Sequence, residues 1–130
     1  MSRAKGNRAA GWVADWVRPW WPGAEATPNS RRGRDILGTP GVAFEIKTGM
    51  EWRASAIKQA AGYAAPGEVP VVVYLPPGCG QRSAGDALCV MPLRVLMPVL
   101  TDAGYAPEPD RAELARHMLR YGPLVTGEGA

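Results

Sequence analysis

The chain has 130 residues, of which 46% are hydrophobic and 21% are charged. This length suits one domain with a single core, and the composition excludes an intrinsically disordered chain. The formal net charge is +3, yet residues 1–58 hold ten of the fifteen Lys and Arg and only five of the twelve Asp and Glu, so the N-terminal half is the better candidate to meet a polyanion.

Membrane, secreted and zinc-binding classes are disfavoured by what the sequence lacks. No stretch approaches the ~20 apolar residues of a membrane span, and no apolar run follows the basic N-terminus as in a signal peptide. Cys79 and Cys89 stand apart from each other and from the single histidine, His117, so a structural zinc site is not expected. We expect a reduced, cytoplasmic protein with no membrane partner.

The first predicted element is a helix at 3–18, because Val13, Trp16 and Val17 form an apolar stripe at helical spacing and Ser2 could cap it. Four of the five tryptophans lie at positions 12 to 21. They either pack this helix on the core or, where exposed, contact a partner.

Three strands are predicted next. Residues 24–28 form a short strand, and residues 34–38 and 42–47 form two strands joined by the turn sequence Gly-Thr-Pro-Gly at 38–41. We expect the last two strands to pair as a tight hairpin.

The second half continues with alternating elements. A helix is predicted at 52–65, a buried β-branched strand at 69–75, a strand at 86–91, and a helix at 93–103 that Pro98 bends or interrupts. Beyond Gly104, two prolines mark a linker before a short helix. The predicted extension consists of residues 106–130, with its helix at 110–121.

The order is helix, three strands, helix, two strands, helix, followed by the C-terminal helix. Such an order predicts a mixed sheet flanked by helices, in the α/β or α+β class. Residues 1–105 are expected to form the domain.

Chemistry-bearing residues concentrate on the predicted hairpin. Folded tightly, it places Asp35 opposite Glu45 within about one residue. Because side chains alternate along a strand, Glu45 and Lys47 share one face while Phe44 and Ile46 point into the core. Two carboxylates and one ammonium group therefore converge at one edge.

Facing carboxylates repel unless positive charge lies between them. Lys47 supplies part of that charge, and a hard cation such as Mg²⁺ supplies more. The combination fits phosphodiester hydrolysis, in which the metal ion polarises the phosphate and lysine orients water or stabilises developing charge. The alternative is a ladder of ordinary surface salt bridges, which this spacing alone would favour.

The ordered motifs resemble the PD-(D/E)XK nuclease superfamily, in particular its Holliday-junction resolvase branch and small phage members of it. The resemblance covers roughly residues 2–105. It rests on Ser-Arg-Ala-Lys-Gly-Asn-Arg-Ala at the N-terminus, Gly-Arg-Asp-Ile at 33–36, Gly-Thr-Pro-Gly at 38–41, Glu-Ile-Lys at 45–47, Gln59, Val-Val-Val at 71–73, and Asp-Ala-Gly-Tyr at 102–105.

This resemblance implies a restriction-endonuclease-like core and a Mg²⁺-dependent endonuclease (with Mn²⁺ as substitute) that acts as a homodimer on branched DNA such as four-way junctions. Asp35, Glu45 and the Ile46 carbonyl would bind metal, Lys47 would be the catalytic lysine, and Gln59 would position water or metal. Gln59 could equally be a solvent-facing helix residue. Six basic residues would contact DNA phosphates: Arg3, Lys5, Arg8, Arg31, Arg32 and Arg34. The Trp-rich turn or the apolar helix at 92–103 could supply the dimer interface.

One departure from the family pattern leaves a second reading open. The family's first-helix glutamate falls at position 10, which is Ala10 here, and Asp15 lies five residues on, at a different face of the helix. The site could work with fewer acids, be silenced, or belong to a non-catalytic DNA-binding or phage-assembly protein on a nuclease-like fold.

Overall fold

The computed structural model describes residues 3–28, 33–49 and 51–125, with side chains from residue 8 onward. The candidate cap Ser2 and the candidate phosphate contacts Arg31 and Arg32 lie outside the described residues, as do the side chains of Arg3 and Lys5.

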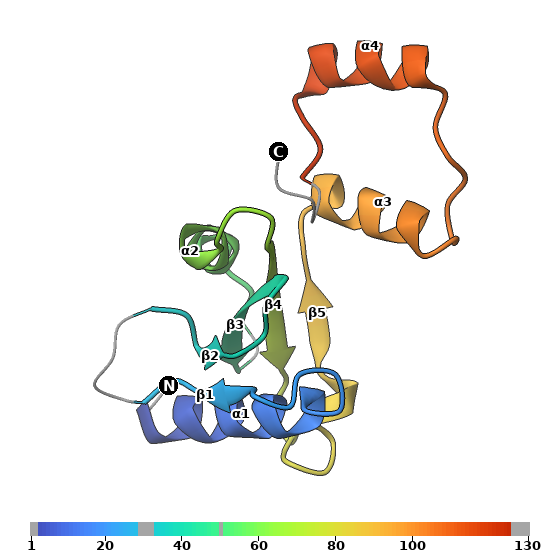
Figure 1. Cartoon of the computed structure of the whole chain (residues 1–130). Helices are drawn as coiled ribbons and strands as arrows, with labels where there is room; N and C mark the ends of the chain where they lie inside the picture. Colours follow the sequence, from blue (N-terminus) through green and yellow to red (C-terminus); the bar gives the residue numbers. More distant parts are fainter. Residues whose placement is uncertain (1–2, 29–32, 50, 126–130) are drawn as a thin grey trace.

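The centre of the molecule is a three-stranded mixed sheet in the order β3-β4-β5 (Figure 1). β3 (Val42–Thr48) and β4 (Val69–Leu75) run parallel, and β5 (Leu88–Val90) is antiparallel to β4. α2 (Ser55–Tyr63) connects the two parallel strands. The predicted element order and the mixed sheet flanked by helices are therefore confirmed.

Two hydrophobic clusters hold the helices against opposite faces of this sheet. α1 (Arg3–Val17) contributes four small or β-branched residues to the larger cluster, which also contains Phe44 and Ile46 of β3. These four residues are Ala9, Ala10, Val13 and Ala14. On the other face, Ala56 and Ala60 of α2 pack on Val72. Small residues on both helices let their backbones approach the sheet closely.

The predicted tight hairpin between residues 34–38 and 42–47 is wrong. β2 (Ile36–Leu37) pairs antiparallel with β1 (Glu25–Ala26) in a separate two-stranded sheet, while β3 pairs with β4. The turn at 38–41 instead connects the two sheets. Gly38 has φ +80°, and its Cα lies against the Gly23 carbonyl so closely that no β-carbon would fit there.

The remaining boundaries differ only locally from the sequence prediction. The expected strand at 86–91 is shortened to β5, because a 3-10 turn, η1 (Ala84–Asp86), occupies its start. α3 (Leu93–Asp102) continues through Pro98 rather than stopping there. Proline has no N–H to bond the Arg94 carbonyl, and that carbonyl instead accepts a hydrogen bond from the Val125 N–H (3.1 Å).

The tryptophans near the end of α1 divide between core and surface. Trp12 and Trp21 pack against the larger cluster, and Trp21 meets Phe44 edge to face with centroids 5.8 Å apart. Trp16 and Trp20 are exposed and stack on each other at 5.6 Å. Packing on the core is therefore confirmed for Trp12 and Trp21, whereas contact of Trp16 and Trp20 with a partner stays a prediction.

The C-terminal part stands away from the sheet (Figure 1). α3 leads out from β5, and α4 (Arg111–Tyr121) returns beside it, so the expected domain boundary at residue 105 falls between these two helices. We call residues 93–125 the α3–α4 arm. None of the helices in the described ranges is long and apolar enough to cross a membrane.

Candidate active site at the open edge of β3

The open edge of β3 is the feature that assembles the candidate site. The Gly41 carbonyl accepts a hydrogen bond from the Val69 N–H of β4 (2.9 Å). Backbone groups alternate between the two edges of a strand, so odd-numbered residues of β3 direct their N–H and C=O groups at β4 and even-numbered residues direct theirs at the open edge.

Side chains from the preceding segment take the place of a neighbouring strand along this edge. The Thr39 hydroxyl donates to the Val42 carbonyl (3.0 Å), and the Asp35 carboxylate Oδ2 accepts from the Ile46 N–H (2.7 Å). Because N–H and C=O of one strand residue point the same way, the Ile46 carbonyl is directed at the same edge as Asp35.

Glu45 lies beside Asp35, as the sequence predicted, although side-chain contacts rather than strand pairing bring them together. Their carboxyl groups lie close enough to interact, because Asp35 is among the causes that raise the pKa of Glu45. Glu45 is only 5% exposed, and its Oε2 atom is buried with no hydrogen-bond partner. Asp35 and Lys47 are half-buried, so the group is reachable from solvent.

The electrostatics of Glu45 follow from this burial. Desolvation, the hydrogen bond to Asp35 and the negative charge of Asp35 raise the pKa of Glu45 from 4.5 to about 8, while the Lys47 ammonium acts in the opposite direction. Without a cation, Glu45 therefore holds a proton at neutral pH. The three predicted residues Asp35, Glu45 and Lys47 do converge.

The donor set fits a hard divalent cation with few protein ligands. Two carboxylates and the Ile46 carbonyl meet at one edge, and the unbonded Oε2 of Glu45 is an acceptor that lacks a partner. Mg²⁺ is commonly held by one or two carboxylates, with waters and substrate phosphates completing its shell. Over the described ranges, no cluster of three or more Asp, Glu, His or Cys side chains occurs.

Ala10 supplies no third acid. It is 5% exposed and belongs to the cluster with Phe44 and Ile46, whereas Glu45 and Lys47 alternate with those residues and point toward the α2 face. Asp15 is exposed and bonded to Arg18.

The remaining candidate residues divide by their surroundings. Arg8 is exposed on α1, and Gln59 is exposed on α2, the helix that packs on β3 and β4. Arg34 is half-buried and donates to Glu68 (2.7 Å) and to the Tyr63 carbonyl. The ion pair joins the segment before β2 to the loop before β4, so Arg34 has a structural role whether or not it also meets phosphate.

Tyr74 is a site residue that sequence reasoning missed. It is the register partner of Lys47 on β4, and its hydroxyl is buried without a hydrogen-bond partner. Paired residues of parallel strands project from the same face, so the side chains of Tyr74 and Lys47 leave the sheet on the same side. The parallel register that makes them neighbours has no signal in the local sequence.

Comparison with known proteins adds no further information, because no protein-family model, curated protein or solved structure matches this chain.

Proposed function

We propose that this protein is a divalent-metal-dependent endonuclease that hydrolyses phosphodiester bonds in branched or structured DNA. The observation that carries the proposal is the convergence of Asp35, Glu45 and Lys47 at the open edge of β3, with the Glu45 Oε2 atom unbonded. A restriction-endonuclease-like core is part of this proposal, and the order of elements agrees with it.

Each residue has a distinct role in the proposed reaction. Asp35, Glu45 and the Ile46 carbonyl would hold Mg²⁺ or Mn²⁺, and the bound ion would polarise a phosphate and lower the pKa of water. Asp35 is oriented for this by the Ile46 N–H. Lys47 would stabilise the charge that develops on phosphoryl oxygens, or hold the attacking water. Gln59, Arg8 and Arg34 remain candidates for positioning and phosphate contact.

A cleavage assay tests the proposal. The protein is incubated with a four-way junction, a duplex and single strands, in Mg²⁺ and in EDTA. We expect metal-dependent cleavage that Lys47→Ala abolishes while DNA binding is retained. Lys58→Ala is the matched control, because Lys58 is an exposed lysine on α2 and its loss should leave cleavage unchanged. Equal cleavage by both variants would refute the assignment.

Metal binding can be measured without any substrate. Mg²⁺ or Mn²⁺ should raise the melting temperature of the wild-type protein, because a ligand that binds only the folded state stabilises it. Asp35→Asn should remove this shift. Equal metal-induced shifts in wild type and variant would place the cation elsewhere.

The second candidate function is DNA binding without cleavage, or assembly of a phage structure, on the same fold. The buried, apolar setting of Ala10 favours it, since the site then lacks a third acid. Binding to the junction with no cleavage in either Mg²⁺ or Mn²⁺ would support this alternative. Ala10→Glu would then test whether the missing carboxylate is the cause.

A further inference from the structure

α4 is a helix that the protomer does not bury. None of its 11 residues is buried, and Leu119 is 89% exposed. Isolated helices of this length are marginal in water even with helix-favouring sequences, since most helical stability in proteins comes from packing an apolar face. A cap by Asp110, whose carboxylate accepts from the Glu113 N–H (2.9 Å), fixes where the helix starts but buries nothing.

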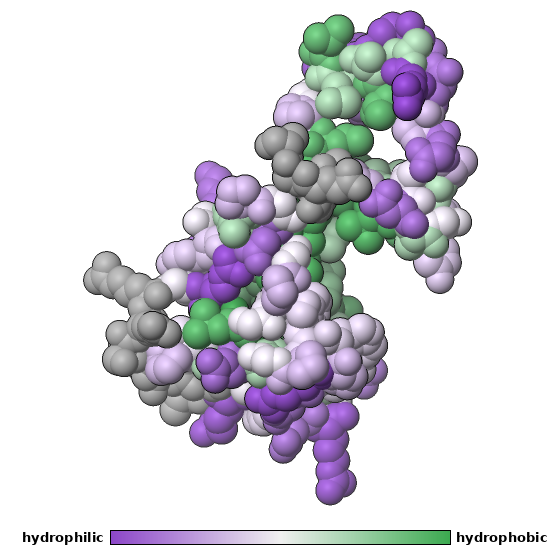
Figure 2. Space-filling model, viewed as in Figure 1, coloured by the Kyte–Doolittle hydropathy of each residue, from purple (hydrophilic) through white to green (hydrophobic). Residues whose placement is uncertain are grey.

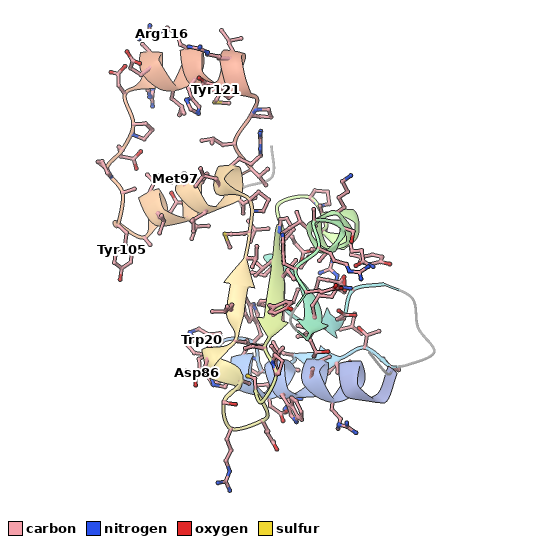
Figure 3. All side chains as sticks on the ribbon, turned by 180° about the vertical axis from the view of Figure 1, so that it is seen from behind. Trp20, Asp86, Met97, Tyr105, Arg116 and Tyr121 are labelled. Atoms are coloured by element: carbon pink, nitrogen blue, oxygen red, sulfur yellow. The ribbon has the colours of Figure 1, made fainter. Side chains whose placement is uncertain are left out.

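α3 and α4 enclose a cleft of about 700 Å³ rather than packing on each other. Met97 and Pro98 lie on its α3 wall, and Leu114 and Tyr121 lie on its α4 wall (Figure 3 shows Met97 and Tyr121). Apolar surface is visible on both helices in Figure 2. The Arg94 guanidinium donates to the Pro123 carbonyl (2.9 Å), which ties the segment after α4 to the start of α3.

The exposed area of the chain is larger than a compact monomer would have. It amounts to 8719 Å², whereas a folded monomer of this mass exposes about 6,700 Å². The excess of about 2,000 Å² exceeds the roughly 800 Å² that each partner buries in a standard interface.

α4 is apolar on two sides, which restricts the partner. Leu114 and Tyr121 face the cleft, and Ala112, Ala115 and Leu119 follow one another at helical spacing on the outer side. A single helix placed in the cleft would cover only the inner side. The outer side needs a second helix.

We propose that a second copy of this chain fills the cleft, with each α4 inserted between α3 and α4 of the other copy. The four helices then lie in the order α3, partner α4, α4, partner α3. In this arrangement the inner side of each α4 packs on the other α4, and its outer side packs on α3 of the other copy. A single two-fold contact therefore covers both apolar sides of each α4. Insertion of one helix into only one of the two copies would leave an outer side exposed.

Charge complementarity favours a second copy over an unrelated protein. Glu113 and Arg120 both line the cleft and are seven residues apart, two turns along one face. When two such helices cross antiparallel about a two-fold axis, Glu113 meets Arg120 of the partner subunit, and the converse pair forms as well. Glu113 forms an exposed ion pair with Arg116 of its own helix (2.6 Å), whereas Arg120 has no ion pair with any described residue of its own protomer.

The mass in solution tests the interface, and this test does not depend on the proposed nuclease activity. Light scattering after gel filtration should give twice the 13.9 kDa of one chain over a wide concentration range. Leu119→Asp should give monomer, since it places a charge against α3 of the second copy. Leu88→Asp is the matched control: this leucine of β5 is 61% exposed and lies outside the arm, so the variant should stay dimeric.

Charge reversal provides a second measurement that a folding defect cannot mimic. Glu113→Arg and Arg120→Glu should each shift the equilibrium toward monomer, and the double variant should restore the dimer. Circular dichroism would verify that helix content is kept. A wild-type monomer, a dimer that survives Leu119→Asp, or a double variant no better than the singles would overturn the proposal. A dimer through the exposed tryptophans would produce the second of these results.

Discussion

The buried carboxyl of Glu45 makes a specific prediction about stability and pH. Its pKa is about 8 in the folded protein against an ordinary 4.5. Between these values the folded state keeps the proton that the unfolded chain has released, so folding becomes less favourable as the pH rises. Below pH 4.5 both states are protonated, and above pH 8 the loss is complete.

The size of the effect follows from the width of this window. Within it, each pH unit lowers the free energy of unfolding by about 1.4 kcal/mol. The total loss between pH 5 and pH 8 is therefore at most about 4 kcal/mol. Glu45→Gln imitates the protonated form, because its amide can still donate to Asp35. We expect the variant to match wild type in free energy of unfolding near pH 5 and to exceed it by up to this amount near pH 8.5.

Urea denaturation in EDTA at half-unit steps from pH 5 to 8.5 measures the difference. Glu25→Gln is the control, because Glu25 is exposed and its loss should not change the slope. Cys89 does not interfere, because it is present in both wild type and Glu45→Gln and its contribution cancels in the difference. A difference between wild type and Glu45→Gln that stays constant with pH would refute the reasoning.

Four further substitutions test the packing around the site. Gly38→Ala should lower the free energy of unfolding by more than about 3 kcal/mol, because its β-carbon would overlap the Gly23 carbonyl. Gly41→Ala has a similar positive φ but open space around it, so it should cost only about 1–2 kcal/mol. Similar urea midpoints for the two variants would contradict this. Arg34→Ala should lower the free energy of unfolding by about 1–2 kcal/mol at neutral pH. This loss should shrink as Glu68 is protonated, since Arg34 lowers the pKa of that carboxyl from 4.5. An unchanged loss at pH 3.5 would count against a role of the ion pair in stability. Ala10→Glu should lower stability by about 3 kcal/mol or more if the carboxylate enters the apolar cluster, and recovery of the melting temperature by Mg²⁺ would show instead that it reaches the metal.

The sequence by itself determined the order of elements and the composition of the strand that carries the site. Turn residues and short-range periodicity are local properties, so the two main helices and the strand at 69–75 could be predicted. Alternation along β3 separated Phe44 and Ile46 from Glu45 and Lys47 correctly, because side chains of any strand alternate.

Only the tertiary structure decided which strands pair and what stands at each edge. A turn such as 38–41 permits a hairpin, but β2 pairs with β1 and β3 pairs with β4, because the pairing of strands depends on burial over the whole chain. Asp35 therefore reaches β3 through its carboxylate rather than through a ladder, and Tyr74 becomes the neighbour of Lys47. The α3–α4 arm follows the same rule. Its two helices could be predicted from the local sequence, but the lack of packing on α4 within the described protomer depends on which elements pack against the sheet.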